Sequence, residues 1–432
     1  MRKLLPALAF AALAAACSRG RASGPLPQEA YVWQRAWTPA VREAVGKAAD
    51  FRSLVVLAAE VDLSSRPPRI ARPAIAWETL QGRPVGLALR IGRFHGWGGN
   101  AGDTGRFADD PGTVRLLAGL AADLSREARS RGIDLGEIQL DYDCPESKLA
   151  DYPVLVRAVD RAVDPTPVTL TALPSWLRHE RAFRDLARSA DGFVLQVHFL
   201  RTPTRPGDTV KLVDPREAVR AVEQAAKAGR PFRVALPTYA YGAVFDERGA
   251  LLGLAAEGSR RSGRAEVSAN PRDIAALVRD WTASRPAEMQ GLLWYRLPTA
   301  DDARNWPWET LRAVMDGRVP KAALRAEIRE PKPLLYEIDV VNTGEAEIPI
   351  PSPLHIRWDS SGDSDTLMAA DAIAGTRLFR SGPREARLEA PATVRTLRPG
   401  ERRTVAWLRF TRPAEVHVEI PSLPPGPAVP AD

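Results

Sequence analysis

The sequence predicts a (β/α)8 TIM barrel followed by an all-β, sandwich-like domain. The chain has 432 residues, which suggests two or three domains, and its hydrophobic content of 45% is enough for a sizeable core. Up to about residue 318, a short β-rich run and a helical pattern alternate eight times, which is typical of α/β folds. After Pro320 the helical patterns become rare, and β-rich runs separated by turn residues follow one another.

The N-terminal segment precedes the barrel. A short basic start is followed by an Ala/Leu-rich run that is too short to span a membrane and ends at Cys17. This order resembles a bacterial lipoprotein signal, which implies removal of residues 1–16, lipidation of Cys17 and a tether over 17–30. Ser18 after the cysteine is similar to the outer-membrane sorting pattern, so we expect a lipid-anchored protein of the cell envelope. A plain secretory signal with an incidental cysteine is the alternative.

Charge and cysteine content exclude several classes of protein. The formal net charge of +7 is spread along the chain without a basic block, so we expect no nucleic-acid partner. The chain has only two cysteines, and Cys144 is left alone once Cys17 is lipidated, which excludes a disulfide framework. No metal-ligand spacing such as H-x-x-x-H occurs, so we expect neither a metal nor another cofactor.

Eight β-rich runs are expected to form the barrel strands within residues 31–318. They are Tyr31–Trp37, Leu54–Val61, Val85–Ile91, Glu137–Asp143, Val168–Leu173, Phe193–Phe199, Arg233–Tyr239 and Gly291–Leu297. Helical stretches lie between them, such as Thr113–Arg131 and Pro215–Ala228. Eight such units favour a closed barrel, and an open sheet of six or seven strands is the alternative.

The second domain is expected over residues 321–420. Its β-rich runs are short, and Asn342-Thr343-Gly344 between two of them is a strong turn signal. Seven or so short strands with turns at regular spacing are typical of a β-sandwich. The Pro-rich tail 421–432 is expected to be disordered, and we assign no catalysis to this domain.

The richest group of polar residues lies at the end of the fourth strand, over Glu137–Pro145. Because side chains alternate along a strand, Gln139, Asp141 and Asp143 share one face, which we expect to point into the barrel. Two neighbouring carboxylates repel each other, so one of them should have a raised pKa and could act as a general acid. The alternative is that both are paired with arginines from neighbouring strands, for which Arg35, Arg90 and Arg296 are available.

This strand resembles the D-G-x-D-x-D-x-E motif of glycoside hydrolase family 18, the chitinase family. The motif lies over Gly136–Asp143, which places Asp143 at the catalytic glutamate, Asp141 at the preceding aspartate and Gln139 at the middle aspartate. Three further segments are similar to the sixth, seventh and eighth strands of that family: Val194–Phe199, Ala235–Gly242 and Gly291–Trp294. The resemblance implies a sugar-binding barrel with Trp294 as the floor of a subsite.

A closer resemblance is to a bacterial lipoprotein family known only as domain of unknown function 3142. It is carried by Tyr31–Arg35, by Gln139–Pro145 and by Asp371-Ala372, and so extends over nearly the whole mature chain. This resemblance implies the same architecture and brings no established activity.

The resemblances and the strand-end residues together predict a polysaccharide cleft. Asp143 is expected to be the general acid and Asp141 its electrostatic partner. Aromatic faces stack on sugar rings, so we take the following strand-end and loop residues as substrate-binding: Gln139, Glu60, His198, Trp294, Tyr239, Trp97 and Arg296. Cys144 is expected to be a buried thiol rather than a nucleophile.

The sequence therefore favours a lipid-anchored glycoside hydrolase that acts on an extracellular or cell-envelope polysaccharide. The alternative is a non-catalytic lipoprotein whose degenerate barrel cleft binds a glycan or a partner protein.

Overall fold

The computed structural model describes residues 20–65, 67–92, 94, 106–198, 210–246, 251–255, 265–360, 366–390 and 396–421. The chain divides into two units, Met1–Trp306 and Pro307–Asp432. The first contains the predicted barrel and the second the predicted all-β domain, so the fold class is confirmed.

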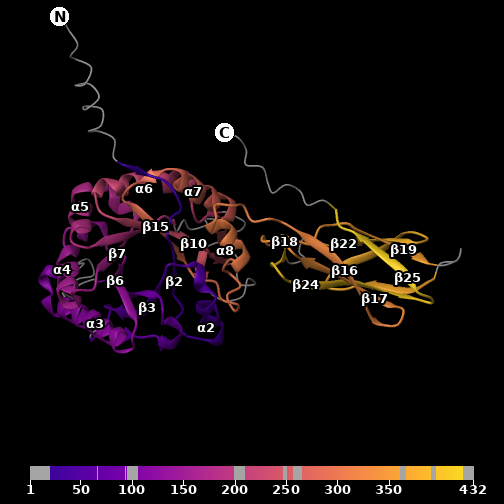
Figure 1. Ribbon diagram of the computed structural model, residues 1–432, viewed down its shortest axis with the longest axis horizontal. Helices are drawn as coiled ribbons and strands as arrows, with labels where there is room; N and C mark the ends of the chain where they lie inside the picture. The colour runs from indigo at the N-terminus through magenta and orange to yellow at the C-terminus, as the bar shows by residue number, and fades with distance from the viewer. Residues whose placement is uncertain are drawn as a thin grey trace, which may run out of the picture. The chain divides into compact units, whose positions relative to one another are not determined.

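In the described part of the first unit, eight parallel strands close into a barrel (Figure 1). They follow one another around the barrel in chain order, and the first pairs with both the second and the last. The strands are β2 (Gln28–Val32), β3 (Ser53–Asp62), β5 (Pro84–Ile91), β6 (Asp134–Tyr142), β7 (Val168–Ala172), β8 (Gly192–Gln196), β10 (Phe232–Pro237) and β15 (Met289–Tyr295). A short antiparallel strand, β4 (Arg69–Ala71), is added to β3.

Helices surround the barrel (Figure 1). They are α2 (Pro39–Gly46), α3 (Pro111–Ser130), α4 (Tyr152–Val163), α5 (Glu180–Arg188), α6 (Pro215–Ala225) and α7 (Pro271–Ala283). Four of them begin with proline directly after a capping side chain, which satisfies free N–H groups of the first turn: Thr38, Asp110, Asp214 and Asn270. Each buries one apolar stripe, and none of the described helices is long and apolar enough to cross a membrane.

A buried ionic group lies inside the barrel near the starts of the strands. Arg233 on β10 donates to Glu29 on β2 and to both carboxylate oxygens of Glu137 on β6, at 2.6 and 2.9 Å. The three side chains are only 10–15% exposed. Burial raises the pKa of Glu29, although the charge of Arg233 opposes the shift. Arg233 therefore supplies the cation that both buried carboxylates share.

Two features of the N-terminal part differ from the sequence prediction. The first barrel strand is Gln28–Val32 rather than Tyr31–Trp37. The segment from Gly20 onward is not a free tether, because β1 (Arg21–Ala22) pairs with β14 (Arg285–Pro286) at the side of the barrel where the strands begin. Arg285, only 7% exposed, donates to the Gly24 carbonyl at 2.7 Å, so the backbone of this Pro/Gly-containing segment finds fixed partners.

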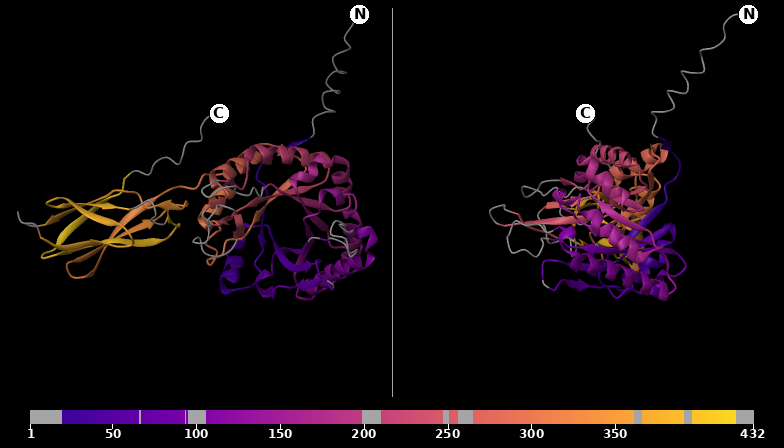
Figure 2. Two further views of the ribbon diagram at one scale, coloured as in Figure 1. Left: turned by 180° about the vertical axis from the view of Figure 1, so that it is seen from behind. Right: turned by 90° about the vertical axis from the view of Figure 1, so that its left-hand side faces the viewer.

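A small sheet that the sequence did not predict is inserted around the seventh barrel strand. Its order is β12 (Leu251–Ala255), β11 (Ala240–Phe245), β13 (Ala265–Ser268) and β9 (Val210–Lys211). β10 ends at Pro237, where the prediction continued the strand to Tyr239. In the right-hand view of Figure 2, the strands of this sheet project from one side of the barrel, and the indigo N-terminal segment lies on the other.

The second unit begins with α8 (Trp308–Met315) and continues as two four-stranded antiparallel sheets. One contains β16 (Leu324–Lys332), β17 (Leu335–Asn342), β24 (Arg402–Phe410) and β20 (Leu367–Ala372). The other contains β21 (Arg377–Gly382), β22 (Glu385–Glu389), β19 (Leu354–Ser360) and β25 (Ala414–Glu419), and β18 (Ile348–Pro349) pairs with β23 (Thr396–Leu397). Side chains of both sheets form one core, which includes Ile338, Ile356, Trp358 and Phe410.

The predicted turn after β17 is present. A Cβ atom at Gly344 would lie 2.5 Å from the Lys321 carbonyl oxygen, so only glycine can occupy this position. The amide of Gly344 donates to the side chain of Asn342 at 2.9 Å.

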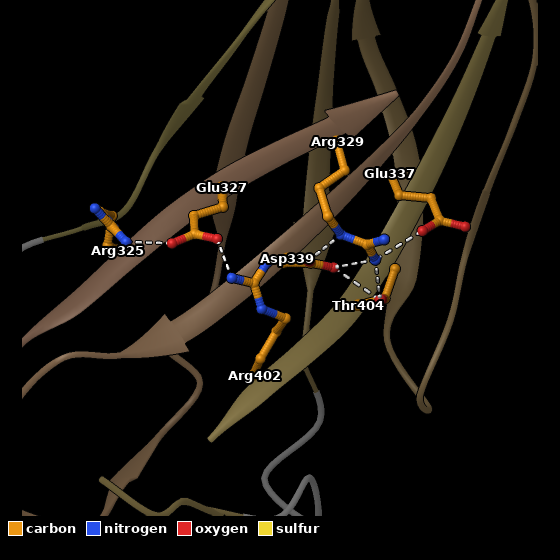
Figure 3. A network of polar contacts seen from close by, with 7 residues as sticks. All are labelled: Arg325, Glu327, Arg329, Glu337, Asp339, Arg402 and Thr404. Atoms are coloured by element: carbon orange, nitrogen blue, oxygen red, sulfur yellow. Dashed lines mark hydrogen bonds and ion pairs between the residues drawn. The ribbon is translucent and has the colours of Figure 1, made fainter. Parts of the chain in front are cut away.

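A polar network stabilises the first sheet of this unit (Figure 3). Asp339 on β17 has a fully buried side chain and accepts hydrogen bonds from Arg329 at 2.6 Å, Thr404 at 2.7 Å and Arg402 at 2.9 Å. Burial alone would raise the pKa of Asp339, but these hydrogen bonds lower it to about 2. The carboxylate is therefore more stable in the folded chain than in the unfolded one.

Replacing Asp339 by asparagine should destabilise the second unit by about 2 kcal/mol at pH 7. The folded-state pKa lies below the unfolded value of 3.8, so this contribution is present above pH 4 and is lost as the pH falls towards 2. Calorimetric unfolding of the full chain at pH 7 and pH 2.5 measures both effects. The exposed Asp359→Asn is the matched control, and equal melting temperatures for the two variants at pH 7 would contradict the prediction.

Candidate active site

A cavity of about 960 Å³ opens where the barrel strands end. Its inner wall comes from six strands and the residues that follow them. It includes Tyr31, Arg90, Asp141, Gln196, Tyr239 and Tyr295. Trp33, Asp143 and His198 follow strand ends and complete this inner part. The C-terminal ends of the strands are the face at which TIM barrels carry their active sites.

Asp141 lies on the barrel-facing side of β6, as the alternation predicted, and is 8% exposed. Thr171 on β7 donates to its carboxylate at 2.9 Å, and a guanidinium nitrogen of Arg90 on β5 lies 3.7 Å away. Burial raises the pKa of Asp141 to about 6; the charge of Arg90 opposes the shift and that of Asp143 adds to it. Near neutral pH this carboxyl group can therefore hold or release a proton.

Asp143 follows β6 directly and lines the same cavity, where its side chain is exposed. Its neighbours Tyr142 and Cys144 are each 2% exposed, because alternate side chains point away from the cavity. Burial raises the pKa of Cys144 to about 12, so the thiol is protonated and unreactive, as predicted.

Aromatic side chains form one wall of the inner cavity around Tyr295. Its ring lies edge to face with those of Tyr31, Trp33 and Tyr239, at centroid distances of 5.5–5.6 Å. Burial raises the pKa of Tyr239 to about 12, so this phenol keeps its proton and can donate a hydrogen bond. Such a wall offers flat apolar faces with polar edges, which is what a sugar ring requires.

His198 stacks on Tyr295 with a centroid distance of 6.1 Å and an interplanar angle of 19°. Its Nδ1 atom is buried and has no hydrogen-bond partner among the described residues. Burial lowers the pKa of His198 to about 4, so the imidazole is neutral at pH 7. His198 therefore contributes a neutral ring to the cavity wall next to Tyr295.

The pairing with arginines that the sequence offered as the alternative is found at Asp141, which forms an ion pair with Arg90 at 3.7 Å, and also at Glu60. Arg35 donates to both oxygens of Glu60, at 2.5 and 2.9 Å, and Arg90 lies 3.8 Å from it. Glu60 is not among the residues that line the cavity, but its negative charge contributes to the raised pKa of Asp141. Arg90 holds no hydrogen bond to Asp141 at 3.7 Å, so its attraction is purely electrostatic.

Besides Glu60, three further predicted substrate-binding residues do not line the cavity. Gln139 is fully buried below Asp141 and accepts a hydrogen bond from Tyr31 at 2.5 Å. Trp294 is fully buried on the outer side of β15, where it donates to Gln28, because the strand turns Leu293 and Tyr295 inward. Arg296 is paired with Asp302 at 2.7 Å beyond the strand end. Trp97 and the expected lipidation site Cys17 lie outside the described residues.

Several cavity residues were not predicted. Tyr295 is adjacent to the predicted Trp294, and strict alternation from the apolar Leu293 would have selected it. The outer part of the cavity comes from the segment after β7 and from α6, which no motif marked: Ser175, Arg178, Glu217, Arg220 and Gln224. Within the described ranges, no cluster of His, Cys, Asp or Glu could hold a metal ion.

The two aspartates and the aromatic side chains thus lie together at the strand ends of a TIM barrel. The family model for "Domain of unknown function (DUF3142)" matches residues 111–300, so the chain contains this domain. The predicted resemblance is thus confirmed, over a shorter stretch than the sequence motifs suggested. No curated protein matches the chain.

Three solved structures that are similar to this chain at low sequence identity are the following. Chitinase ChiA74 from Bacillus thuringiensis is 10% identical, with a TM-score of 0.42 over 91% of this chain and 100% of that one. The spore cortex-lytic enzyme SleL from Bacillus cereus is 10% identical, with a TM-score of 0.48 over 69% and 75%. The xylanase and alpha-amylase inhibitor protein from Scadoxus multiflorus is 11% identical, with a TM-score of 0.38 over 68% and 98%.

Replacing Asp141 by asparagine should stabilise the protein at pH 8 by about 1–3 kcal/mol. The folded-state pKa of about 6 lies above the unfolded value of 3.8, so ionisation of Asp141 lowers stability as the pH rises from 4 to 6. The asparagine cannot ionise and can still accept from Thr171. Urea unfolding at pH 4 and pH 8 checks this. The free energy of unfolding of the variant should exceed that of the wild type only at pH 8, and a lower value at pH 8 would contradict the raised pKa.

Proposed function

We propose that this protein is a lipid-anchored glycoside hydrolase of the cell envelope that cleaves a polysaccharide by carboxylate acid/base catalysis. The observation that carries the proposal is that Asp141 and Asp143 line one cavity together with Trp33, Tyr239 and Tyr295. Paired carboxylates next to aromatic faces are what cleavage of a glycosidic bond requires.

The exposed Asp143 is the general acid in this proposal. It gives its proton to the glycosidic oxygen while the bond from that oxygen to the anomeric carbon breaks. Water supplies the hydroxyl group to the anomeric carbon, and the proton that water loses restores the acid. Asp141 is the electrostatic partner, because its carboxylate lines the same cavity and can stabilise the positive charge that develops on the sugar as the bond breaks. Tyr295 and Trp33 stack on the sugar, and His198 binds one of its polar groups.

Lipidation of Cys17 after removal of residues 1–16 would hold the enzyme at the outer membrane, as the sequence pattern predicts. Expression with a radiolabelled fatty acid tests this part of the proposal. The full-length protein should carry the label and sediment with membranes, whereas Cys17→Ser should carry none. Secretion of an unlabelled wild-type protein would overturn the anchor and leave the cavity chemistry untouched.

The alternative function is a non-catalytic lipoprotein that binds a glycan in the same cavity. It is favoured by Gln139, which stands where the family 18 motif has a third carboxylate and is buried with Tyr31. Incubating the mature protein with a panel of polysaccharides separates the two functions. New reducing ends support the hydrolase, and tight binding without them supports the binding protein. If the protein neither cleaves nor binds any of the polysaccharides, both functions are overturned.

A further inference from the structure

The cavity extends outward from the two aspartates over the residues after β7 and along one side of α6. We call this extension the outer arm, and it is made of Ser175, Arg178, Glu217, Arg220 and Gln224. The outer arm is continuous with the inner cavity, so a single glycan that occupies both must contain several sugar residues.

Arg178 is held in place in the outer arm by Glu146. Its Nε and Nη2 atoms donate to the two carboxylate oxygens at 2.8 and 2.6 Å. Hydrogen bonds from Arg178 lower the pKa of Glu146 to about 2, so the pair stays charged over the physiological range. Nη1 has no hydrogen-bond partner among the described residues. One edge of the oriented guanidinium group is therefore open to a ligand.

Arg220 on α6 is the second cation of the outer arm. Its side chain is exposed, and no hydrogen bond or ion pair joins it to another residue within the described ranges. Glu217, one turn earlier on the same helix, is half-buried and contributes the one carboxylate among the described residues that line the arm.

The charges of the cavity are therefore separated. The inner part has two carboxylates, Asp141 and Asp143, against Arg90, whereas the outer arm has Arg178 and Arg220 against Glu217 and the Glu146 carboxylate that is paired with Arg178. A negatively charged group of a ligand is repelled near the aspartates, whereas in the arm it can bind to Arg220 and to the remaining edge of Arg178. The arrangement of charges therefore favours chains whose charged sugar lies in the outer arm when the neighbouring sugar lies at the aspartates.

We infer that the outer arm binds the carboxylate of an acidic sugar, so that the proposed enzyme acts on an anionic glycan whose charged unit lies outside the reacting pair. Arginine recognises a planar carboxylate through two parallel N–H groups, and two arginines in a groove favour such a group over a neutral sugar. The inference rests on the proposed function and adds the substrate class to it.

Calorimetric titration of the mature protein with three probes tests the inference. Hexagalacturonate and glycan strands of peptidoglycan, which carry carboxylates on different sugars, distinguish two sources of the same chemistry, and chitohexaose is the neutral probe. We expect at least one acidic probe to bind more tightly than chitohexaose. Arg178→Gln and Arg220→Gln should each weaken that binding about tenfold and leave chitohexaose binding unchanged.

Arg157→Gln is the matched control, because Arg157 is exposed on α4 away from the cavity and loses the same charge. An equal loss in this control would mean that net charge, not the outer arm, drives binding, and would overturn the inference. Binding of chitohexaose as tight as that of both acidic probes would also overturn it while the proposed function stands. A protein that binds none of the three probes would overturn both.

Discussion

Replacing Asp143 by asparagine should lower the rate of polysaccharide cleavage by about 10²–10⁴-fold. The amide has the same shape as the carboxylic acid but cannot give a proton to the departing oxygen. The aromatic wall around Tyr295 and the cavity remain, so the apparent affinity for substrate should change little. Initial rates of reducing-end formation at several substrate concentrations separate kcat from KM and measure both effects.

The control for this experiment is Asp134→Asn. Asp134 is an exposed residue at the other end of β6, so the same substitution is made on the same strand far from the cavity. This variant should retain full activity. A wild-type rate in Asp143→Asn would remove Asp143 from the mechanism and make Asp141, with its pKa of about 6, the remaining candidate for the general acid.

The largest effect on stability is expected at Arg233. Replacement by methionine leaves Glu29 and Glu137 buried without a cation, which should cost about 3–5 kcal/mol at pH 7. Unpaired buried carboxylates have raised pKa values, so the variant should regain stability below pH 4.5 and lose it as the pH rises. Urea unfolding followed by tryptophan fluorescence at pH 4 and pH 7 measures this dependence.

A triple variant provides the control for Arg233. Adding Glu29→Gln and Glu137→Gln to Arg233→Met removes both carboxylates, so most of the lost stability at pH 7 should return. Equal stabilities of the single and the triple variant would indicate that packing of the arginine side chain, rather than charge neutralisation, stabilises this part of the barrel.

Local patterns in the sequence were sufficient to predict the barrel and the direction of the side chains on its fourth strand. Alternation over Glu137–Asp143 placed Asp141 inside the barrel, because apolar residues on the other face pack against helices. The prediction that Trp294 lines the cavity was wrong, because it rested only on the resemblance to the family 18 motif. Leu293 and Tyr295 face into the barrel, so the side chain of Trp294 between them points outward.

Features that depend on contacts distant in sequence were not predictable. Arg178 and Glu146 are 32 residues apart, and β1 and β14 pair across more than half of the chain. Each of these segments looks like an ordinary exposed loop on its own. Only the closed barrel brings them together, so neither the outer arm nor the fixed N-terminal strand could be derived from the sequence.

If Cys17 carries a lipid, the pairing of β1 with β14 determines which way the barrel faces. β14 precedes β15, so the fixed segment lies where the strands begin, on the side of the barrel opposite to the small inserted sheet (Figure 2), whereas the cavity opens where the strands end. Only three residues separate Cys17 from Arg21, and a fully extended stretch of that length spans about 10 Å. With a lipid on Cys17, the bilayer would lie close to the base of the barrel, and the cavity would open away from it. Polymers beyond the membrane surface, rather than lipid headgroups, would then reach the two aspartates.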